Sequence, residues 1–449
     1  MKVRHYIFVL MAMALVACGG CKGPAPEPEP DLTLITQTVP MTDNWLWSSR
    51  PDITIRIKND NTTDVKVGVN VRYTTDSKTA VETVADSVVV AANSSVDYHA
   101  TTTKDLDPGF YRAICIVNGK TAKSFIFGID PFKIVSAPDK QPDFEQFWQA
   151  AKDQLAAIDM NAKLTEIESK SSATRKVYLV EMQSIPDGLS GEPVLIRGYY
   201  CEPQDGQKHP VIMHFYGYDT QGSKAKCECP AGGSSKNAEF YLSHRGQYLN
   251  SRPAGTNPGI EEATVNIYGD WFSYNFGDKD SWYYRGAFMD VVQAVRFMAT
   301  RETSDMSKLF AEGSSQGGAL TYACAALSDY PFSAIAANVA FLGDYADAMS
   351  IGGLAAETAK ACKGSMTTDE MLAFLSYFDT KNLTPRISCA VLASSGLQDN
   401  VCPPRTNVVP FNNLATPESE KEYMFGPEMY HDYPTGWYTK MNELFKSKM

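Results

Sequence analysis

The segment Gly313-Ser314-Ser315-Gln316-Gly317-Gly318 constrains the fold of this chain more than any other. Residues 308–312 before it favour a short strand, and residues 319–327 after it are rich in helix formers. A G-x-S-x-G sequence between a strand and a helix forces a sharp turn that only small flanking residues allow. Such a turn lifts Ser315 Oγ above the sheet edge and leaves backbone N–H groups at the helix N-terminus free to hold an oxyanion.

A serine in such a turn needs an acid and a histidine, which follow it in that order along the chain. The chain has 6 histidines, and only His431 lies after Ser315. The apolar run at residues 387–395 is of strand type and ends in a turn that places Asp399 at its carboxyl end. We therefore predict a catalytic triad of Ser315, His431 and Asp399. A turn-capping role for Asp399 and a surface-loop position for His431 are the alternative interpretations.

The segments upstream of this turn follow the alternation of an α/β domain. Asp143 and Gln146, three residues apart, are typical of a capping box and open a predicted amphipathic helix. Residues 285–300 form a second amphipathic helix. Strand-like runs lie between the two helices at residues 176–182, 193–200 and 210–216. We predict a doubly wound α/β sheet over residues 140–449, after a boundary at residues 131–142.

Residues 32–135 have the pattern of an all-β domain. Apolar and polar side chains alternate over residues 53–58 and 65–72, which indicates strands with one solvated face. Further strand-like runs follow at residues 87–92, 95–100, 110–117 and 123–128. This spacing predicts an immunoglobulin-like sandwich. A spacer or interdomain packing role is favoured for it. Sugar binding is the alternative, with Tyr73, Tyr98 and Tyr111 as platform residues.

The N-terminal residues 1–17 are predicted to be a lipoprotein signal peptide. Residues 7–17 form an apolar run of about 11 residues, of signal-peptide length and too short to span a bilayer. Leu15-Val16-Ala17-Cys18 resembles a bacterial lipobox, and an ordinary secretory signal is the alternative. Residues 18–31 are rich in Pro and Glu and predict an extended tether. We expect export, with a lipid on Cys18 anchoring the chain to the periplasmic or cell-surface face of a bacterial membrane.

The composition limits the classes of partner. With 44% hydrophobic and 21% charged residues over 449 positions, the chain is globular in character and long enough for two domains. A net charge of -11 argues against nucleic acid and against an anionic membrane surface as the main partner. Cys227 and Cys229, with Cys201, are poor evidence for zinc because C-x-C lacks a nearby histidine and regular spacing. We therefore predict no metal and no cofactor.

Residues 140–449 carry several motifs of one enzyme family. They are Arg245-Gly246-Gln247, the glutamine after Ser315, Gly396-Leu397-Gln398-Asp399 with Cys402-Pro403-Pro404, and His431 with an acidic neighbour. With these motifs the chain resembles the acetyl xylan esterase and cephalosporin C deacetylase family, carbohydrate esterase family seven. Two positions differ from that family. Asp432 stands where the family usually has Glu, and Tyr216 precedes Gly217-Tyr218 where it tends to have His. Neither change touches the triad.

The resemblance implies an α/β-hydrolase fold and a serine esterase that removes acetyl groups from acetylated saccharides or other small acetyl esters through an acyl-enzyme. The backbone N–H of Gln316, directly after the nucleophile, and that of Tyr218, at the family's loop position, would hold the oxyanion. Arg245, Gly246 and Gln247 would support the site structurally, and a substrate clamp is the alternative for the arginine. Polysaccharide degradation would suit a surface-anchored deacetylase, and a homo-oligomer is one assembly that the resemblance allows.

Three other functions are alternatives at this point. The first is an α/β-hydrolase peptidase of the prolyl oligopeptidase type, which normally needs a β domain larger than residues 32–135. The second is a non-catalytic glycan-binding lipoprotein, and the third is an esterase of other acyl specificity. Substrate contact and core packing are equally compatible with the aromatic residues that precede the Ser315 turn, which are Trp271, Trp282, Tyr283 and Tyr284.

Overall fold

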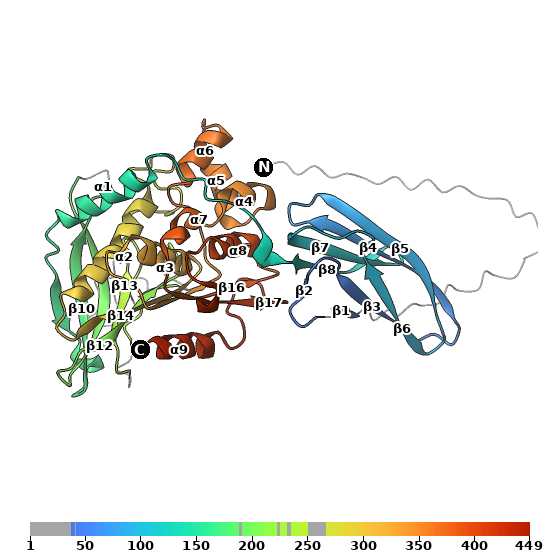
Figure 1. Cartoon of the computed structure of the whole chain (residues 1–449), viewed down its shortest axis with the longest axis horizontal. Coiled ribbons are helices and arrows are strands. Elements are labelled where there is room, and N and C mark those ends of the chain that lie inside the picture. Colours follow the sequence, from blue (N-terminus) through green and yellow to red (C-terminus); the bar gives the residue numbers. More distant parts are fainter. Residues whose placement is uncertain (1–36, 41, 188–190, 222–224, 231–234, 250–265) are drawn as a thin grey trace, which may run out of the picture.

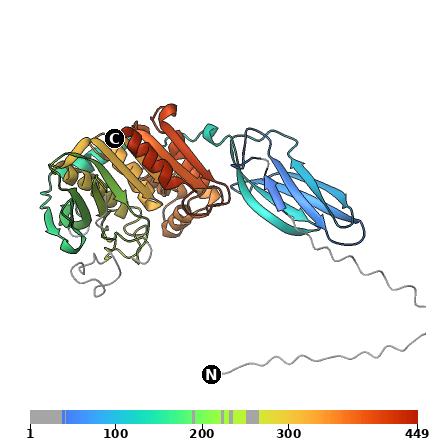
Figure 2. The same ribbon diagram turned by 90° about the horizontal axis from the view of Figure 1, so that it is seen from below.

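The computed structural model describes residues 37–40, 42–187, 191–221, 225–230, 235–249 and 266–449. The predicted signal peptide and tether lie outside these ranges. The two views show a β-sandwich at one end of an elongated molecule and a larger α/β domain at the other (Figure 1, Figure 2). Within the described ranges, no helix combines the length and the apolar character needed to cross a bilayer.

The N-terminal domain is a sandwich of two sheets. One sheet has the order β1-β3-β6 and the other the order β2-β8-β7-β4-β5. All pairs are antiparallel except β2 with β8. This arrangement confirms the predicted immunoglobulin-like sandwich. The strands are β1 (Gln37–Pro40), β2 (Leu46–Trp47), β3 (Asp52–Asn59), β4 (Val65–Thr75), β5 (Ala80–Val90), β6 (Ser94–Thr101), β7 (Gly109–Val117) and β8 (Lys120–Ile129).

Tyrosines of the sandwich serve its core. Tyr111, near the start of β7, donates its hydroxyl proton to the Asp107 carbonyl at 2.8 Å, which is the tyrosine corner of such sandwiches. Tyr73 donates to the Ala100 carbonyl on the opposite sheet at 2.7 Å. Both rings are buried, and Tyr98 packs against the same apolar cluster. Tyr73 and Tyr111 are therefore core and corner residues, while Tyr98 is partly buried.

The C-terminal domain is built on a nine-stranded sheet of order β17-β16-β15-β14-β12-β13-β11-β10-β9. Strands β12 to β17 pair in parallel, and β9 to β11 add antiparallel pairs at one edge. The strands are β9 (Lys163–Glu166), β10 (Arg175–Ser184), β11 (Val194–Pro203), β12 (His209–Phe215), β13 (Ala238–Ser243), β14 (Ser304–Ser314), β15 (Ala334–Asn338), β16 (Ala390–Gly396) and β17 (Lys421–Gly426).

Helices cover both faces of this sheet, as a doubly wound fold requires. Trp437, Met441 and Phe445 of α9 pack on one face, against alternate residues of β14, β15 and β16. The intervening residues of the same strands face α2, α3 and the other helices. The helices are α1 (Phe144–Ala156), α2 (Tyr283–Ala299), α3 (Gln316–Leu327), α4 (Tyr345–Ile351), α5 (Leu354–Cys362), α6 (Thr368–Leu375), α7 (Thr380–Leu383), α8 (Pro404–Asn412) and α9 (Trp437–Lys448).

The start of α1 differs from the prediction. Asp143 directly precedes the helix, but its side chain accepts no hydrogen bond from the first turn, so the capping box with Gln146 is not formed. The Asp143 carboxylate instead accepts a hydrogen bond from the hydroxyl of Tyr377, a residue far away in the sequence. A helix N-cap typically stabilises a protein by about 1 kcal/mol. Here the tertiary contact with Tyr377 takes the place of that cap.

The two domains share an apolar interface. Leu397, Val408 and Val409 of the C-terminal domain belong to the same buried cluster as the core of the sandwich. The ring of Phe132, just after β8, packs against that of Phe425 in β17, with centroids 5.8 Å apart. The sandwich is therefore packed directly against the segments that follow β16 and the edge strand β17.

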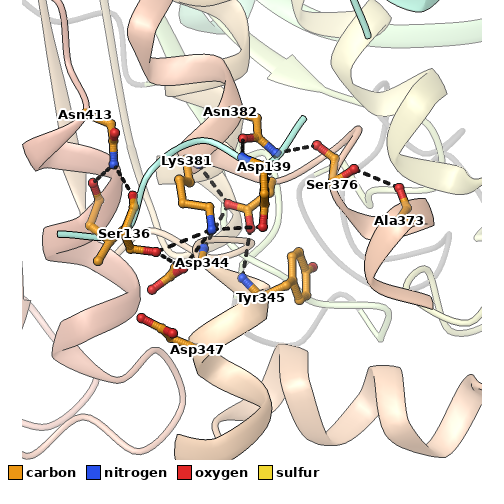
Figure 3. Close-up of polar contacts among 12 residues, drawn as sticks. Ser136, Asp139, Asp344, Tyr345, Asp347, Ala373, Ser376, Lys381, Asn382 and Asn413 are labelled. Atoms are coloured by element: carbon orange, nitrogen blue, oxygen red, sulfur yellow. Dashed lines mark hydrogen bonds and ion pairs between the residues drawn. The ribbon is translucent and has the colours of Figure 1, made fainter. Parts of the chain in front are cut away.

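A buried polar cluster fixes the connecting segment between the domains (Figure 3). Lys381 Nζ lies 3.1 Å from Asp344 Oδ1 and 3.0 Å from Asp139 Oδ2, and its side chain is 1% exposed. Ser136 Oγ donates to Asp344 Oδ1 at 3.0 Å. Asn382 Nδ2 donates to the other oxygen of Asp139 at 2.9 Å. The connection is thus held by charge pairs as well as by apolar packing.

Candidate active site

The predicted turn at Ser315 lies between β14 and α3. Ser315 has φ 59°, an uncommon backbone conformation for a residue other than glycine, and directly precedes the first residue of α3. Its neighbours must be small. A Cβ atom on Gly317 would lie 2.4 Å from the Phe215 carbonyl oxygen, and one on Gly313 would lie 2.4 Å from Gly317. The close approach of strand and helix therefore explains the glycines of the motif.

The structure brings together the three residues of the predicted triad. His431 Nε2 lies 2.9 Å from Ser315 Oγ, and His431 Nδ1 lies 2.8 Å from Asp399 Oδ2. The other oxygen of Asp399 accepts the backbone N–H groups of Val401 and Cys402 at 2.8 and 2.9 Å. These bonds hold the carboxylate toward the ring. With Nδ1–H donating to Asp399, Nε2 is the nitrogen that can accept the serine proton.

The loop that carries Gly217 and Tyr218 lies directly against the nucleophile. A Cβ atom on Gly217 would lie 3.8 Å from Ser315 Cβ and 3.6 Å from the Ser314 carbonyl oxygen. The Tyr218 hydroxyl donates to Asp270 Oδ2 at 2.7 Å, so its side chain is fixed at a neighbouring segment. Gln316 is the first residue of α3. Both residues predicted to supply oxyanion donors therefore flank Ser315.

Gln247 supports the loop of Tyr218. Its side-chain amide donates to the carbonyls of Ala225 at 2.9 Å and Gly217 at 3.3 Å. The preceding Gly246 has φ 76°, and a Cβ atom there would lie 2.7 Å from the ring of Tyr268. These contacts place both residues in a structural role beside the site, without exposure to a substrate.

Arg245 anchors helix α2. Its guanidinium donates to both carboxylate oxygens of Asp290 at 2.9 and 2.8 Å and to the Ile185 carbonyl at 3.1 Å. The side chains of Arg245 and Asp290 are 2% and 0% exposed, so the arginine cannot act as a substrate clamp. The guanidinium also lies so close to Gly286 that a Cβ atom there would be 1.9 Å from it. Arg245 is therefore a buried support of the domain.

His244 is a residue of the site that the sequence analysis missed. Its Nε2 accepts a hydrogen bond from Gln316 Nε2 at 3.0 Å, and its Nδ1 lies 2.8 Å from the Tyr283 hydroxyl. The Tyr284 hydroxyl donates to Gln316 Oε1 at 2.8 Å. Both ends of the Gln316 amide are thus fixed beside the nucleophile. In the sequence, His244 is marked only by its position directly before Arg245. No spacing rule connects this histidine to Gln316.

We predict that acid destabilises the protein through His244. Burial lowers its pKa from 6.5 to about 4. The unfolded state therefore takes up the proton first, and the stability present above pH ~6.5 is lost as the pH falls toward ~4. The loss should reach about 2 kcal/mol between pH 7 and pH 4.5. Urea unfolding of wild type and His244→Asn at both pH values measures it. Equal pH dependence in the two proteins would contradict the prediction.

Aromatic residues before α2 and at its start form the core beneath the site. They are Trp271, Trp282, Tyr283 and Tyr284, and each is at most 1% exposed. Trp271 stacks on Tyr283 with centroids 5.4 Å apart. Their position favours core packing over substrate contact. No group of three or more His, Cys, Asp or Glu side chains within the described ranges is arranged to hold a metal ion.

Comparisons with known proteins identify the family of the C-terminal domain. Residues 132–449 match the family model of acetyl xylan esterases, AXE1. The acetyl esterase Axe7A of Xylanibacter ruminicola is 25% identical over 337 residues, which are 72% of this chain and 71% of that protein.

Two solved structures share the fold. Acetyl xylan esterase 1 from Thermoanaerobacterium sp. JW/SL YS485 has a TM-score of 0.56 and 21% identity over 70% of this chain and 96% of its own. An acetyl xylan esterase from Paenibacillus sp. R4 has a TM-score of 0.55 and 24% identity over 71% of this chain and 98% of its own. These similarities confirm the predicted α/β-hydrolase fold for the C-terminal domain.

Proposed function

The chain belongs to the acetyl xylan esterase family and is a carboxylic ester hydrolase, and we propose that it removes acetyl groups from saccharides through an acetyl-enzyme on Ser315. The observation that carries this proposal is the unbroken chain of hydrogen bonds from Asp399 through His431 to Ser315. The named relatives are acetyl esterases and acetyl xylan esterases, which supports an acetylated xylo-oligosaccharide as the substrate.

The reaction begins when Ser315 Oγ attacks the acetyl carbonyl and its proton passes to His431 Nε2. Asp399 holds the ring and stabilises the imidazolium that forms. The carbonyl oxygen becomes an oxyanion between the backbone N–H groups of Gln316 and Tyr218. Each such donor stabilises the transition state by about 3 kcal/mol, so Gln247 and His244, which fix these two segments, serve the reaction indirectly.

Collapse of the tetrahedral intermediate breaks the bond to the sugar oxygen. His431 gives its proton to that oxygen, and the sugar leaves as an alcohol while the acetyl group stays on Ser315. A water molecule then attacks the acetyl carbonyl, with His431 again taking the proton. Acetate leaves, and the proton returns from His431 to the serine oxygen.

We also propose that the enzyme is exported and anchored to a bacterial membrane by a lipid on Cys18. The support is the lipobox-like segment followed by the Pro- and Glu-rich residues 18–31. Radioactive palmitate incorporation into the full chain in a bacterial host tests this directly. The label should be lost in Cys18→Ala, and a labelled Cys18→Ala protein would contradict the proposal.

The reaction is tested with protein lacking the residues before Asp31. Acetate release is measured from 4-nitrophenyl acetate, its longer-chain esters and acetylated xylo-oligosaccharides, and rapid-quench mass spectrometry looks for an acetyl group on Ser315. We expect fast turnover of acetyl esters, slow turnover of longer esters and a labelled Ser315 peptide. Preference for longer acyl chains, turnover of peptide amides, or no turnover by folded protein would each overturn the proposal.

A further inference from the structure

A cavity of about 340 Å³ lies between the sandwich and the C-terminal domain. The sandwich lines it with three charged side chains, Asp76, Lys78 and Arg112. The C-terminal domain lines it with the polar side chains of Gln398 and Asn400 and with Tyr430. Its volume falls in the range of small-ligand sites, which combine an enclosing wall with a few polar groups.

The cavity borders the two loops that carry the triad. Asp399 contributes to its wall, and Tyr430 directly precedes His431. Both loops bind each other through the backbone, because Gln398 N–H donates to the Met429 carbonyl at 3.0 Å. The cavity therefore borders the loops of Asp399 and His431, although Ser315 and His431 themselves do not line it.

Gln398 holds the two walls of the cavity together. Its Oε1 accepts the backbone N–H of Ile126 at 2.9 Å, and its Nε2 donates to the Ile126 carbonyl at 3.0 Å. Ile126 belongs to β8, so the amide side chain pairs with this strand as a backbone amide would. Gln398 Nε2 also donates to the Pro427 carbonyl at 2.8 Å, in the loop before His431. These hydrogen bonds fix the sandwich against the C-terminal domain at the cavity, so the cavity exists without a movement of the two domains.

Asp76 presents an unused acceptor within this wall. One carboxylate oxygen accepts the Ser77 backbone N–H at 2.9 Å, while the other is buried and has no hydrogen-bond partner among the described residues. Burial raises the pKa of Asp76, which fits an acid removed from water. Because that oxygen is enclosed, a ligand hydroxyl gains it as a partner only when the Asp76 side chain turns toward the cavity.

Arg112 and Lys78 supply donors in the same wall. Arg112 Nη1 donates to Ser124 Oγ at the long distance of 3.4 Å, and no ion pair of the described residues includes Arg112 or Lys78. Tyr430 is 65% exposed. Hydroxyl groups both donate and accept, and a sugar ring offers C–H faces to an aromatic side chain. A wall with an acceptor, donors and an exposed ring therefore suits a polyhydroxylated ligand.

We propose that this cavity is a subsite for a sugar unit of an oligosaccharide whose acetylated unit lies at Ser315, with Asp76 and Arg112 of the sandwich as its specificity-determining residues. The inference rests on the proposed function and extends it, because it makes the sandwich part of substrate binding. It also selects oligomeric over monomeric acetylated sugars as the preferred substrate.

The test compares a substrate that reaches the cavity with one that does not. Asp76→Asn and Arg112→Met should each raise the KM for acetylated xylotetraose about five- to tenfold, the usual net effect of one lost hydrogen bond. Their kcat on this substrate and their turnover of 4-nitrophenyl acetate should change less than twofold. Arg72→Met is the matched control, because Arg72 is exposed on the same sheet and does not line the cavity. Its KM should be that of wild type.

A binding measurement separates this inference from the reaction itself. Calorimetry with Ser315→Ala protein and deacetylated xylotetraose should show binding that Asp76→Asn weakens about five- to tenfold. This result would support the subsite even if acetyl esters were not turned over. Normal hydrolysis of 4-nitrophenyl acetate together with xylotetraose binding and KM values unaffected by both substitutions would overturn the subsite and leave the esterase intact.

Discussion

Ser315→Ala should lower kcat for acetyl-ester hydrolysis by about a millionfold, and Asp399→Asn by about ten-thousandfold. The first substitution removes the oxygen that attacks the ester. The second keeps the shape of the site, but an asparagine no longer fixes the proton on His431 Nδ1 as the carboxylate does at 2.8 Å. Steady-state kinetics with 4-nitrophenyl acetate measures both effects.

The neighbouring serine offers a matched control. Ser314 Oγ accepts a hydrogen bond from Asn338 Nδ2 at 2.7 Å, whereas Ser315 Oγ lies 2.9 Å from the histidine of the triad. Ser314→Ala should therefore cost less than tenfold in kcat, because it loses one hydrogen bond and no reacting atom. Equal losses in the two alanine variants, or a wild-type kcat in Asp399→Asn, would contradict the assignment of the nucleophile and its acid.

The triad could be predicted because each of its members was constrained by chain order. Only one histidine follows Ser315, and Asp399 lies in the turn after the apolar run at residues 387–395. The short spacing of G-x-S-x-G makes the turn a local property, and the structure reproduces it at the start of α3. The sandwich was also predictable, because period-two alternation depends on the strand itself and not on its partners.

Contacts between distant polar residues could not be predicted in this way. His244 and Gln316 lie 72 positions apart, and their pairing depends on how β13 and β14 are placed in the sheet. The polar and charged residues that line the cavity come from two domains, and the packing of β8 on Gln398 brings them together. Asp143 shows a second limit of local patterns, because its sequence context predicts a helix cap while its carboxylate accepts a hydrogen bond from the distant Tyr377.

A second large effect should follow from Lys381→Met, which we expect to lower the free energy of unfolding by about 3–5 kcal/mol. Burial alone lowers the pKa of Lys381, but the carboxylates of Asp379, Asp344 and Asp139 raise it above its ordinary value. Removing the ammonium would leave the buried Asp344 and Asp379 carboxylates without their lysine partner. Figure 3 shows Lys381 beside Asp344. Urea unfolding at pH 8 measures the loss.

The cluster also holds a strained segment against the nucleophile. Val339, Leu342 and Asp344 all have positive φ, an unfavourable conformation for such side chains. The Asp379 carboxylate accepts the backbone N–H groups of Asp344 and Tyr345, both at 2.8 Å, and so fixes one end of the segment. Within the segment, Phe341 N–H donates to the Ser315 carbonyl at 3.0 Å. Loss of Lys381 should therefore lower kcat as well as stability.

The pH dependence distinguishes a charge effect from a packing effect. Burial raises the pKa of Asp379 to about 7 and that of Asp344 to about 6, so the folded state keeps protons that the unfolded state loses near pH ~4. The stabilising contribution of these two carboxyl groups to the folded state is full below pH ~4 and is lost as the pH rises through ~6 to ~7. The loss caused by Lys381→Met should be larger at pH 8 than at pH 5.

The exposed pair of Lys440 with Glu422 provides the control, because Lys440→Met should cost at most about 1 kcal/mol at either pH. Its lysine lies on a surface helix and faces water, so losing its charge leaves no buried acid behind. A loss in Lys381→Met that is the same at pH 5 and pH 8 would mean that the buried carboxylates do not respond to the lysine, and would reduce Lys381 to a packing residue.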